Sequence, residues 1–340
     1  KFNKIFNAIG SAAVLMDIHN GEIISIISLP DFDPNKRERI VDVNYINRAT
    51  KGIYELGSVF KTFTLAAALN EEIINPETKF KNLEKSIKCG KNTISEYDKK
   101  IPENLTAEEI LIRSGNIGSV RIGQAIGIEK LKKFLNDLNL LNAIKFDIEE
   151  IGKPITFNWG KCKLATTSYG HGITTTILQL ANAYAILGNG GYKINPTLIK
   201  KESYSKKERI LKKDISKNLI QILRKIVTTK EGTASLANVS GYEVSGKTGT
   251  AEKIKDGGYS RKKINTFASI FPASNPKFSL VVMLDEPKIN SDYIYHYRDG
   301  SGIKYKGTPF NTAGWTSVEV AGQIIEKIGP ILATKYIQVY

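Results

Sequence analysis

Tyr54-Glu-Leu-Gly-Ser-Val-Phe-Lys-Thr-Phe-Thr-Leu-Ala-Ala-Ala-Leu69 joins a glycine turn to an almost unbroken run of apolar, helix-forming residues. This pattern predicts a buried helix that begins near Ser58. Ser58 and Lys61 are three residues apart, so a helix would place the hydroxyl and the amine on one face. Both would lie in the first turn, where free N–H groups and the helix dipole favour developing negative charge. The stretch therefore fits either an activated serine nucleophile or an ordinary helix start with Ser58 as the N-cap.

The Ser-x-x-Lys spacing by itself does not single out Ser58. The same spacing recurs at Ser203, Ser260, Ser274 and Ser301. Most such matches are accidental in a chain so rich in lysine. None of these four serines is followed by a buried-looking helix, so context makes Ser58 the candidate.

Composition indicates a folded chain with a substantial core. The chain has 340 residues, 41% of them hydrophobic, which is enough for one large domain or a domain with an insertion. The net charge of +15 could attract nucleic acid or an anionic surface. The lysines are scattered, however, and no zinc-finger spacing or aromatic RNA-binding motif accompanies them, which argues against nucleic-acid binding.

The two cysteines, Cys89 and Cys162, form no metal-ligand pattern and could be free thiols or one disulfide. None of the three histidines belongs to an H-E-x-x-H sequence, which argues against a zinc protease. No apolar run is long enough to cross a bilayer. Because the chain opens with Lys1, we expect a soluble fragment or processed product from which an upstream anchor has been removed.

The order of apolar runs predicts an α/β (α+β) chain. Two β-rich runs around Asn20-Gly21 predict a hairpin, and Thr106 to Glu109 reads as a helix capping box. The closing helix should stop at Gly329-Pro330. We expect one mixed sheet from the N- and C-terminal segments, with a sheet subdomain over about 1–57 and 240–340 and a mainly helical subdomain over about 58–239. Helices are expected over 58–69, 117–126, 129–140, 174–187, 215–227 and 318–328, and strands over 12–18, 22–29, 244–251, 267–271 and 278–284.

Three short elements fall in a fixed order: Ser58-Val-Phe-Lys61, Ser114-Gly-Asn116 and Lys247-Thr-Gly249. Each is weak alone, but each has a fitting context of helix start, inter-helix loop and strand. Such a triple is typical of penicillin-binding proteins and serine β-lactamases. Together with the stretches 30–35, 47–64, 168–173 and 247–252, the chain resembles class B penicillin-binding proteins, and among them the cell-division (septal) peptidoglycan D,D-transpeptidases.

The resemblance covers nearly the whole chain and implies a transpeptidase domain, 1–340, with the penicillin-binding protein / serine β-lactamase-like fold. Family members usually carry an N-terminal membrane helix and a pedestal domain, and the resemblance implies that neither is part of this sequence. The implied activity is cross-linking of peptidoglycan stem peptides at the periplasmic face of the inner membrane. The implied partners are a D-Ala-D-Ala donor, an amine acceptor, β-lactam antibiotics, divisome proteins and a glycan polymerase. No metal and no organic cofactor are implied.

The resemblance also implies roles for single residues. Ser58 would be the nucleophile and Lys61 its general base, kept neutral by burial and by the nearby Lys247 cation. Ser114 would relay a proton, Asn116 would bind a substrate backbone amide, and Lys247 would supply positive potential.

In the strand element, Thr248, Gly249 and Thr250 would bind the substrate, with the two hydroxyls holding its terminal carboxylate. The backbone N–H groups of Ser58 and Thr250 would form the oxyanion hole. In contrast, we expect His171 to be a hydrogen-bonded structural residue and Glu55 to be only a turn residue.

Two alternatives remain open on the sequence. A class A β-lactamase would place a Glu-x-x-x-Asn element after the second motif, and nothing between Ser114 and Lys247 matches it. The middle residue of that motif is also Gly115 rather than Asp. A class D-like serine β-lactamase is harder to exclude, and a non-catalytic β-lactam sensor or scaffold domain would share the same acylation chemistry.

Overall fold

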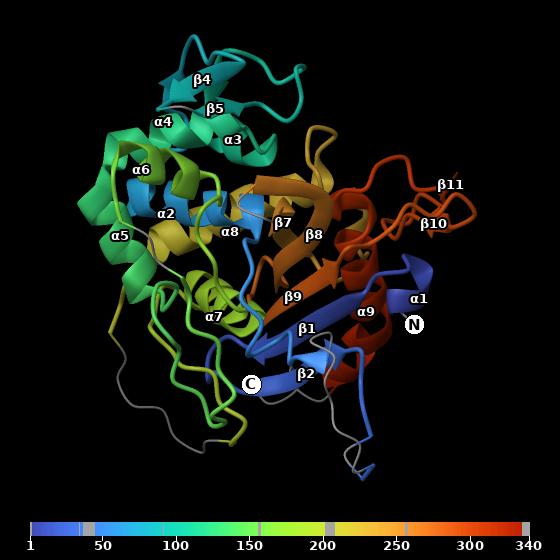
Figure 1. Cartoon of the computed structure of the whole chain (residues 1–340). Helices are drawn as coiled ribbons and strands as arrows, with labels where there is room; N and C mark the ends of the chain where they lie inside the picture. Colours follow the sequence, from blue (N-terminus) through green and yellow to red (C-terminus); the bar gives the residue numbers. More distant parts are fainter. Residues whose placement is uncertain are drawn as a thin grey trace.

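The computed structural model describes residues 2–33, 35–36, 45–90, 92–155, 158–200, 208–255 and 258–334. A five-stranded sheet with the strand order β2-β1-β9-β8-β7 forms the centre of the fold, and a lobe of helices lies beyond its β7 edge (Figure 1). The strands are β1 (Gly10–Asp17), β2 (Ile23–Leu29), β3 (Lys79–Phe80), β4 (Ser86–Cys89), β5 (Asn92–Ser95), β6 (Leu105–Thr106), β7 (Ser245–Lys255), β8 (Gly258–Phe271), β9 (Phe278–Asp285), β10 (Ile294–His296) and β11 (Lys304–Lys306).

The hairpin predicted at Asn20-Gly21 is confirmed, and it joins β1 to β2. Gly21 has a φ of +83°, which glycine adopts without strain. A Cβ at this position would lie 2.2 Å from the carbonyl oxygen of Asn195. The Asp17 carboxylate accepts the N–H groups of His19 and Asn20, so the turn is held by a side chain as well as by its glycine.

The N-terminal hairpin pairs with the C-terminal strands, because β1 lies between β2 and β9. The prediction that both chain ends build one sheet is therefore confirmed. The described sheet is not mixed, however, since every pairing in it is antiparallel. Strands β7, β8 and β9 follow one another through short connections, which only antiparallel neighbours permit. The strand predicted over 267–271 is the end of β8, which begins at Gly258.

Helices cover both faces of the sheet, as the burial of all eight β9 residues requires. On one face, Ser279 of β9 donates its hydroxyl to the Ala181 carbonyl of α7, and α9 packs on the other face (Figure 1). The helices predicted over 117–126, 129–140, 174–187 and 215–227 correspond to α4, α5, α7 and α8. The helices are α1 (Phe2–Ile5), α2 (Lys61–Asn70), α3 (Ala107–Ile112), α4 (Asn116–Ile126), α5 (Ile128–Asp137), α6 (Lys161–Ser168), α7 (Ile177–Gly188), α8 (Lys213–Thr228) and α9 (Ser317–Leu332), with short 3-10 helices η2 (Gly57–Phe60), η3 (Ser235–Ala237) and η4 (Ala313–Trp315).

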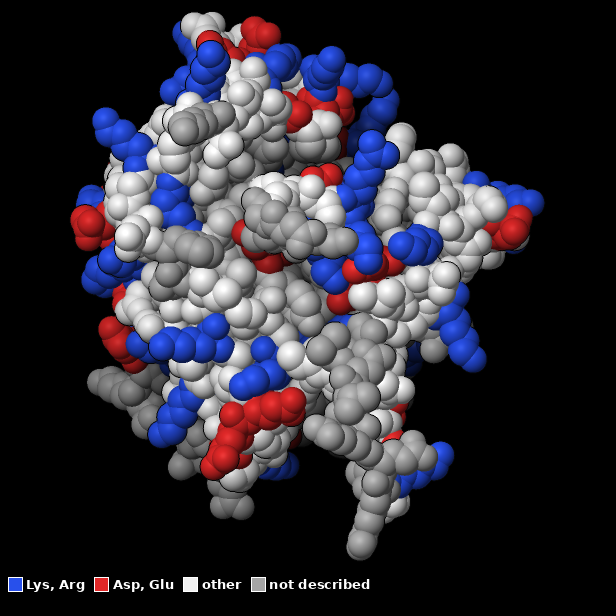
Figure 2. Space-filling model, viewed as in Figure 1, with Lys and Arg blue, Asp and Glu red and all other residues white. Residues whose placement is uncertain are grey.

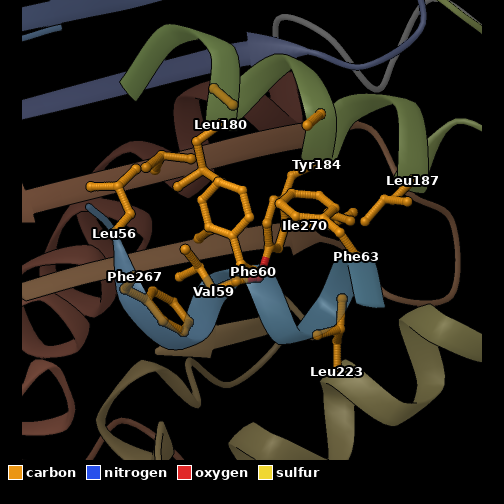
Figure 3. Packing of buried hydrophobic residues seen from close by; sticks show 14 of the residues in the cluster. Leu56, Val59, Phe60, Phe63, Leu180, Tyr184, Leu187, Leu223, Phe267 and Ile270 are labelled. Carbon is orange, nitrogen blue, oxygen red and sulfur yellow. Dashed lines mark hydrogen bonds between the residues drawn. The ribbon is translucent and has the colours of Figure 1, made fainter. Parts of the chain in front are cut away.

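The buried helix predicted near Ser58 is confirmed as η2 followed by α2, in which every residue from 61 to 69 is buried. Figure 3 shows its aromatic side chains pointing toward α7. The Phe60 and Phe63 rings meet edge to face, with centroids 5.4 Å apart, and Phe63 meets Tyr184 of α7 in the same way at 5.5 Å. The Tyr184 hydroxyl is 2.9 Å from Thr62 Oγ1, so this buried polar group also has a partner. These contacts fix the helix that carries Lys61.

The end of α9 and the state of the two cysteines were also predicted from the sequence. The closing helix does not stop at Gly329-Pro330 but continues to Leu332. Pro330 has no N–H to donate to the carbonyl one turn earlier. Near the end of α9 that carbonyl can bond to water instead, so the helix tolerates the proline. Cys89 and Cys162 form a disulfide with their Cα atoms 5.4 Å apart, which decides between the two alternatives and ties the β4–β5 hairpin to α6.

Helices α2 to α8 lie between residues 61 and 228, and the strands of the main sheet lie outside that range. Because α7 also packs directly on the sheet, the subdomain limits near 58 and 239 remain a prediction. Within the described ranges, no helix combines the length and apolar character that crossing a bilayer requires.

Candidate active site

The three sequence elements meet in one cleft between the helical lobe and the edge strand β7. The cleft has a volume of about 810 Å³. Of the predicted site residues, Ser58, Ser114, Asn116, Thr248 and Thr250 line it. Lys61 and Lys247 lie beneath it, with exposed fractions of 1% and 0%. The structure therefore brings the predicted side chains together, while their chemical roles stay predictions.

Glycines bring the backbone that carries Ser58 against β7. Gly57 has a φ of +62°, and a Cβ there would lie 2.9 Å from the Thr250 carbonyl oxygen. A Cβ on Gly249 would lie 2.1 Å from the Leu56 carbonyl oxygen, so this residue serves the close approach of two backbones. A Cβ on Gly170 would lie 1.9 Å from the Gly57 carbonyl oxygen. Gly170, next to His171, therefore permits the close approach of the loop before α7 to the backbone that carries Ser58.

Lys61 makes hydrogen bonds to the second motif. Its amine donates to the carbonyl oxygen of Ser114, to Ser114 Oγ at 3.2 Å and to Asn116 Oδ1 at 2.7 Å. Burial lowers the pKa of this amine to about 7, against an opposing effect of the Glu96 carboxylate. Burial therefore favours the neutral amine, the form that can accept a proton. Ser58, half-buried in η2, has no hydrogen bond to Lys61 within the described chain.

Ser114 lies at a strained backbone position just after α3. Its φ is +58°, the left-handed region that costs a non-glycine residue roughly 1–2 kcal/mol. Its N–H bonds to the Leu111 carbonyl at 3.1 Å, which ends the helix. This conformation leaves both its carbonyl and its hydroxyl available to the buried amines.

Lys247 reaches Ser114 from the opposite side. Its amine donates to Ser114 Oγ at 2.8 Å and to the Thr248 carbonyl at 3.2 Å. Burial and the nearby Lys61 ammonium lower the pKa of Lys247. The single hydroxyl of Ser114 therefore connects two amines, which is the connection that a proton relay requires.

Asn116 begins α4 and is held by a residue that the sequence did not reveal. The Glu96 carboxylate accepts the N–H of Asn116 at 2.7 Å and that of Ile117 at 2.8 Å, which caps a helix whose own N-cap, Gly115, has no side chain. The Asn116 amide gives one N–H to the Ser95 carbonyl at 2.8 Å, so its other N–H remains for a substrate. Glu96 lies in a polar loop without a recognisable motif.

The two threonines of β7 are joined to residues outside the three motifs. Thr248 Oγ1 is 2.6 Å from Thr233 Oγ1, and Thr250 Oγ1 accepts the N–H of Ala313 at 3.0 Å. Because β7 is the edge strand, every second N–H along it points away from β8. Such an edge can offer N–H groups to a bound carbonyl, as the predicted oxyanion hole requires.

The expectation that Glu55 is only a turn residue was wrong, while the structural role expected of His171 stays a prediction. Glu55 is buried, with an exposed fraction of 8%, and its carboxylate accepts the Gly172 N–H at 2.9 Å and the Tyr259 hydroxyl at 3.2 Å. It joins the loop before α7 to the β7–β8 hairpin and is more than a turn residue. The His171 ring lies between Tyr169 and Tyr259, with centroids 4.8 and 5.5 Å away, and lines the cleft. Burial and the Lys61 charge lower its pKa to about 4.

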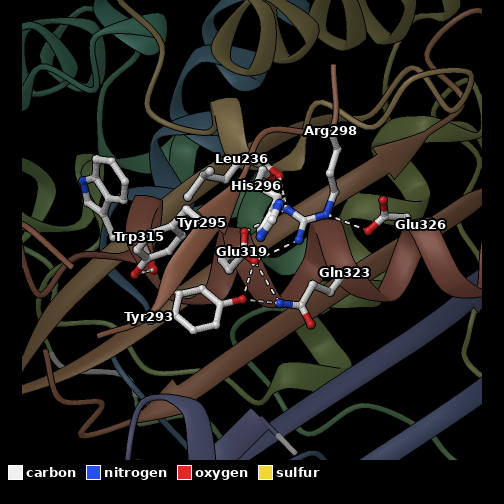
Figure 4. Close-up of polar contacts among 9 residues, drawn as sticks. All are labelled: Leu236, Tyr293, Tyr295, His296, Arg298, Trp315, Glu319, Gln323 and Glu326. Atoms are coloured by element: carbon white, nitrogen blue, oxygen red, sulfur yellow. Dashed lines mark hydrogen bonds and ion pairs between the residues drawn. The ribbon is translucent and has the colours of Figure 1, made fainter. Parts of the chain in front are cut away.

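The far wall of the cleft is held by a buried ion pair (Figure 4). Arg298 bonds both oxygens of Glu319 on α9 at 2.8 Å, and these two side chains are only 6% and 1% exposed. Arg298 also donates to the carbonyl of Leu236, which lines the cleft. The Tyr295 hydroxyl donates to the carbonyl of Trp315, another lining residue. The wall is therefore fixed to α9.

Surface charge gives no sign of a nucleic-acid site on the face seen in Figure 2, where Asp and Glu lie between the scattered Lys and Arg. No three His, Cys, Asp or Glu side chains gather in a group that could hold a metal ion anywhere in the part of the chain that the structure describes.

Comparisons with known proteins agree with this geometry. The family model described as "Penicillin binding protein transpeptidase domain" matches residues 11–302. The chain belongs to the penicillin-binding-protein transpeptidase family. The transpeptidase domain from Burkholderia pseudomallei penicillin-binding protein 3 superposes with a TM-score of 0.81 over 97% of this chain and 90% of that one, at 24% identity, which supports the fold.

Curated relatives include the probable peptidoglycan D,D-transpeptidase FtsI of Caulobacter vibrioides, 32% identical over 97% of this chain and 55% of the relative. Stage V sporulation protein D of Bacillus subtilis is 33% identical over 82% of this chain and 46% of its own length. The FtsI protein of Buchnera aphidicola subsp. Baizongia pistaciae is 33% identical over 83% and 50%. The chain thus spans about half the length of these relatives.

Proposed function

We propose that this chain is the catalytic domain of a peptidoglycan D,D-transpeptidase that forms peptide cross-links through a serine acyl-enzyme. The observation that carries the proposal is the buried network beneath Ser58. In it, Lys61 bonds Ser114 and Asn116, and Lys247 bonds Ser114 from the other side. This network couples an amine of lowered pKa to a second amine through one hydroxyl, next to a cleft lined by further hydroxyl groups.

In the acylation step, Ser58 Oγ attacks the carbonyl carbon of the penultimate D-Ala while its proton passes to Lys61 Nζ. A hydrogen bond between base and nucleophile often forms only when substrate is bound, so the lack of one here is compatible with this role. The backbone N–H groups of Ser58 and Thr250 stabilise the oxyanion. The C–N bond to the terminal D-Ala then breaks, and its nitrogen receives a proton relayed through Ser114.

In the second step, an amine from a neighbouring stem peptide attacks the Ser58 ester, and the serine regains its proton as the new amide forms. Water in place of the amine would give carboxypeptidase activity. In the preceding acylation step, Asn116 holds the donor backbone, the hydroxyls of Thr248 and Thr250 hold the carboxylate of the terminal D-Ala, and Lys247 supplies positive potential. A β-lactam would acylate Ser58 in the same geometry, since it presents a carboxylate and a reactive carbonyl.

We also propose where in the cell the domain acts and with which proteins. The relatives named peptidoglycan D,D-transpeptidase FtsI support a role in peptidoglycan cross-linking, and we propose that this takes place in the septal wall, at the periplasmic face of the cytoplasmic membrane. There the domain would be anchored by an N-terminal helix and would work with divisome proteins and a glycan polymerase.

The test is labelling with a fluorescent penicillin, followed by incubation with a D-Ala-D-Ala thioester donor and a D-amino-acid acceptor. We expect stoichiometric acylation, slow release of the label and exchange of the donor. Ser58→Ala should abolish labelling, and Ser301→Ala should not, because Ser301 has the same Ser-x-x-Lys spacing in an exposed loop. Rapid antibiotic turnover would instead identify a β-lactamase. Stable acylation with no exchange in a donor-acceptor assay would favour a sensor, and labelling of Ser58→Ala would refute the site.

A further inference from the structure

The edge strand β7 presents a charged residue to the cleft beyond the predicted catalytic elements. Alternate residues of a strand share a face, and Thr248, Thr250 and Glu252 all line the cleft. Of the intervening residues, Gly249 has no side chain and Ala251 is buried. At roughly 3.3 Å per residue, Glu252 lies about 13 Å along the strand from Thr248.

The charges along β7 indicate in which direction a bound donor peptide runs. This inference rests on the proposed function. Thr248 lies beside the Lys247 amine and the Thr233 hydroxyl, which suits the terminal carboxylate. The scissile carbonyl is then next to Ser58. The donor continues past Thr250, and each extended residue spans up to about 3.5 Å. The side chain of the residue that precedes D-Ala-D-Ala therefore reaches the end of β7 that carries Glu252.

Glu252 has an oppositely charged neighbour in the same part of the cleft. Lys263 of β8 is its direct cross-strand partner and also lines the cleft. Opposite charges at such positions are close enough to pair. Within the described chain, however, the Glu252 carboxylate has no hydrogen bond or ion pair, and the Lys263 amine donates to the Asn311 carbonyl at 3.1 Å.

The neighbouring lysines of these two strands, in contrast, pair with carboxylates at the end of β9. Lys253 bonds Asp285 at 2.9 Å and Glu286 at 3.0 Å, and Lys262 bonds Glu286 at 2.9 Å. These four side chains form one ion-pair network just outside the cleft. The pair at the cleft is thus left with one free carboxylate and one amine that still has N–H groups to donate.

We propose that Glu252 and Lys263 form a subsite for the side chain of the stem-peptide residue that precedes D-Ala-D-Ala. The subsite selects a side chain that ends in both an ammonium and a carboxylate, such as that of a diamino dicarboxylic acid. Glu252 accepts the ammonium and Lys263 donates to the carboxylate. A lysine side chain would satisfy only Glu252.

The test uses the acylation rate with three penicillins whose amide side chains differ at the far end. An α-aminoadipyl group ends in an ammonium and a carboxylate, an adipyl group in a carboxylate alone, and a phenylacetyl group is uncharged. Because these rates do not depend on peptide exchange, failure of the subsite and failure of the transpeptidase proposal are distinguishable. The second-order acylation rate constant is measured for each, at low and high salt.

We expect the wild type to prefer α-aminoadipyl over adipyl penicillin by roughly threefold to fivefold, the size of an exposed ion pair, and to lose this preference in 1 M salt. Glu252→Gln should remove this preference. Lys263→Met should instead remove the preference for adipyl over phenylacetyl penicillin. Glu103→Gln and Lys153→Met, at exposed positions outside the cleft, are the matched controls and should keep both ratios.

Equal rates for the three penicillins in the wild type would overturn the subsite. So would ratios that Glu252→Gln and Lys263→Met leave unchanged. If the single variants fold poorly, the same ratios are measured with Glu252→Asp, which keeps the charge on a shorter side chain and should retain part of the preference. A ratio that follows charge in this way would not result from a loss of stability, since all three compounds acylate the same folded protein.

Discussion

The pH dependence of acylation is the sharpest consequence of the buried Lys61 amine. Its pKa of about 7 means that the neutral form, the one able to accept a proton, predominates above pH 7. The neutral fraction falls to about one-tenth at pH 6 and about one-hundredth at pH 5, since each pH unit is a tenfold change. If Lys61 is the base, the second-order rate constant of penicillin acylation should fall about tenfold per unit below pH 7 and level off above it.

The assay is stopped-flow acylation with a fluorescent penicillin between pH 5 and pH 9, with circular dichroism to confirm folding at each pH. Glu96→Gln is the informative variant. The Glu96 carboxylate raises the pKa of Lys61, so removing its charge should move the midpoint to lower pH. Glu103→Gln, in an exposed position, should leave the midpoint in place. His171 does not obscure the result, because its pKa of about 4 lies below the range measured.

A rate constant that stays level from pH 5 to pH 7 would refute Lys61 as the base. A midpoint that Glu96→Gln leaves unmoved would refute the electrostatic link between the two groups. A midpoint that moves to higher pH would contradict the sign of that link.

Three further predictions concern stability and packing. Glu319→Gln removes the buried charge partner of Arg298 and leaves it only the exposed Glu326 carboxylate, so it should lower the free energy of unfolding by up to roughly 3–5 kcal/mol, measured by urea denaturation. Reducing the disulfide, whose cysteines are 73 residues apart, should lower the free energy of unfolding by about 4 kcal/mol in the chain-entropy treatment, measured in guanidinium with and without dithiothreitol. Gly170→Ala places a Cβ 1.9 Å from a carbonyl oxygen at a φ of +93° and should slow acylation and cost more than about 2 kcal/mol of stability.

For each of these three predictions, one result would contradict the reasoning. A loss below about 1 kcal/mol in Glu319→Gln would mean that the Arg298 charge is not held by this pair. An unchanged guanidinium midpoint on reduction would mean that the disulfide does not constrain the unfolded chain. For Gly170→Ala the matched control is Gly160→Ala, where a Cβ meets nothing within 4 Å. Equal effects at the two positions would contradict the packing argument.

The predictions from sequence succeeded where a local pattern carries the structural information. The Ser58 helix, the hairpin at Asn20-Gly21 and the meeting of the three motifs are all visible in residue order. Helix α6 was missed, because Lys161–Ser168 is short and contains few apolar residues. A tertiary contact, by contrast, has no local signal.

Glu96 and Glu55 illustrate this limit. Glu96 is a single carboxylate in a polar stretch and Glu55 one between Tyr54 and Leu56, and only the fold shows that the first caps α4 and the second joins two loops. The direction of the strands was also mispredicted as mixed, since the hydrophobic pattern of a strand does not reveal which neighbour it pairs with. The charged pair Glu252 and Lys263 became visible only through the cross-strand register.

The position of β1 between β2 and β9 has a consequence for how the protein is made. A ribosome delivers the N-terminal hairpin first, but its partner strand β9 ends at residue 285. Contacts between such distant segments close late and slow folding. The cleft also needs β7, so an emerging chain holds Ser58 and Lys61 long before it holds Thr248 and Thr250. A nascent chain should therefore remain unreactive toward penicillin until β7 and β9 have been synthesised.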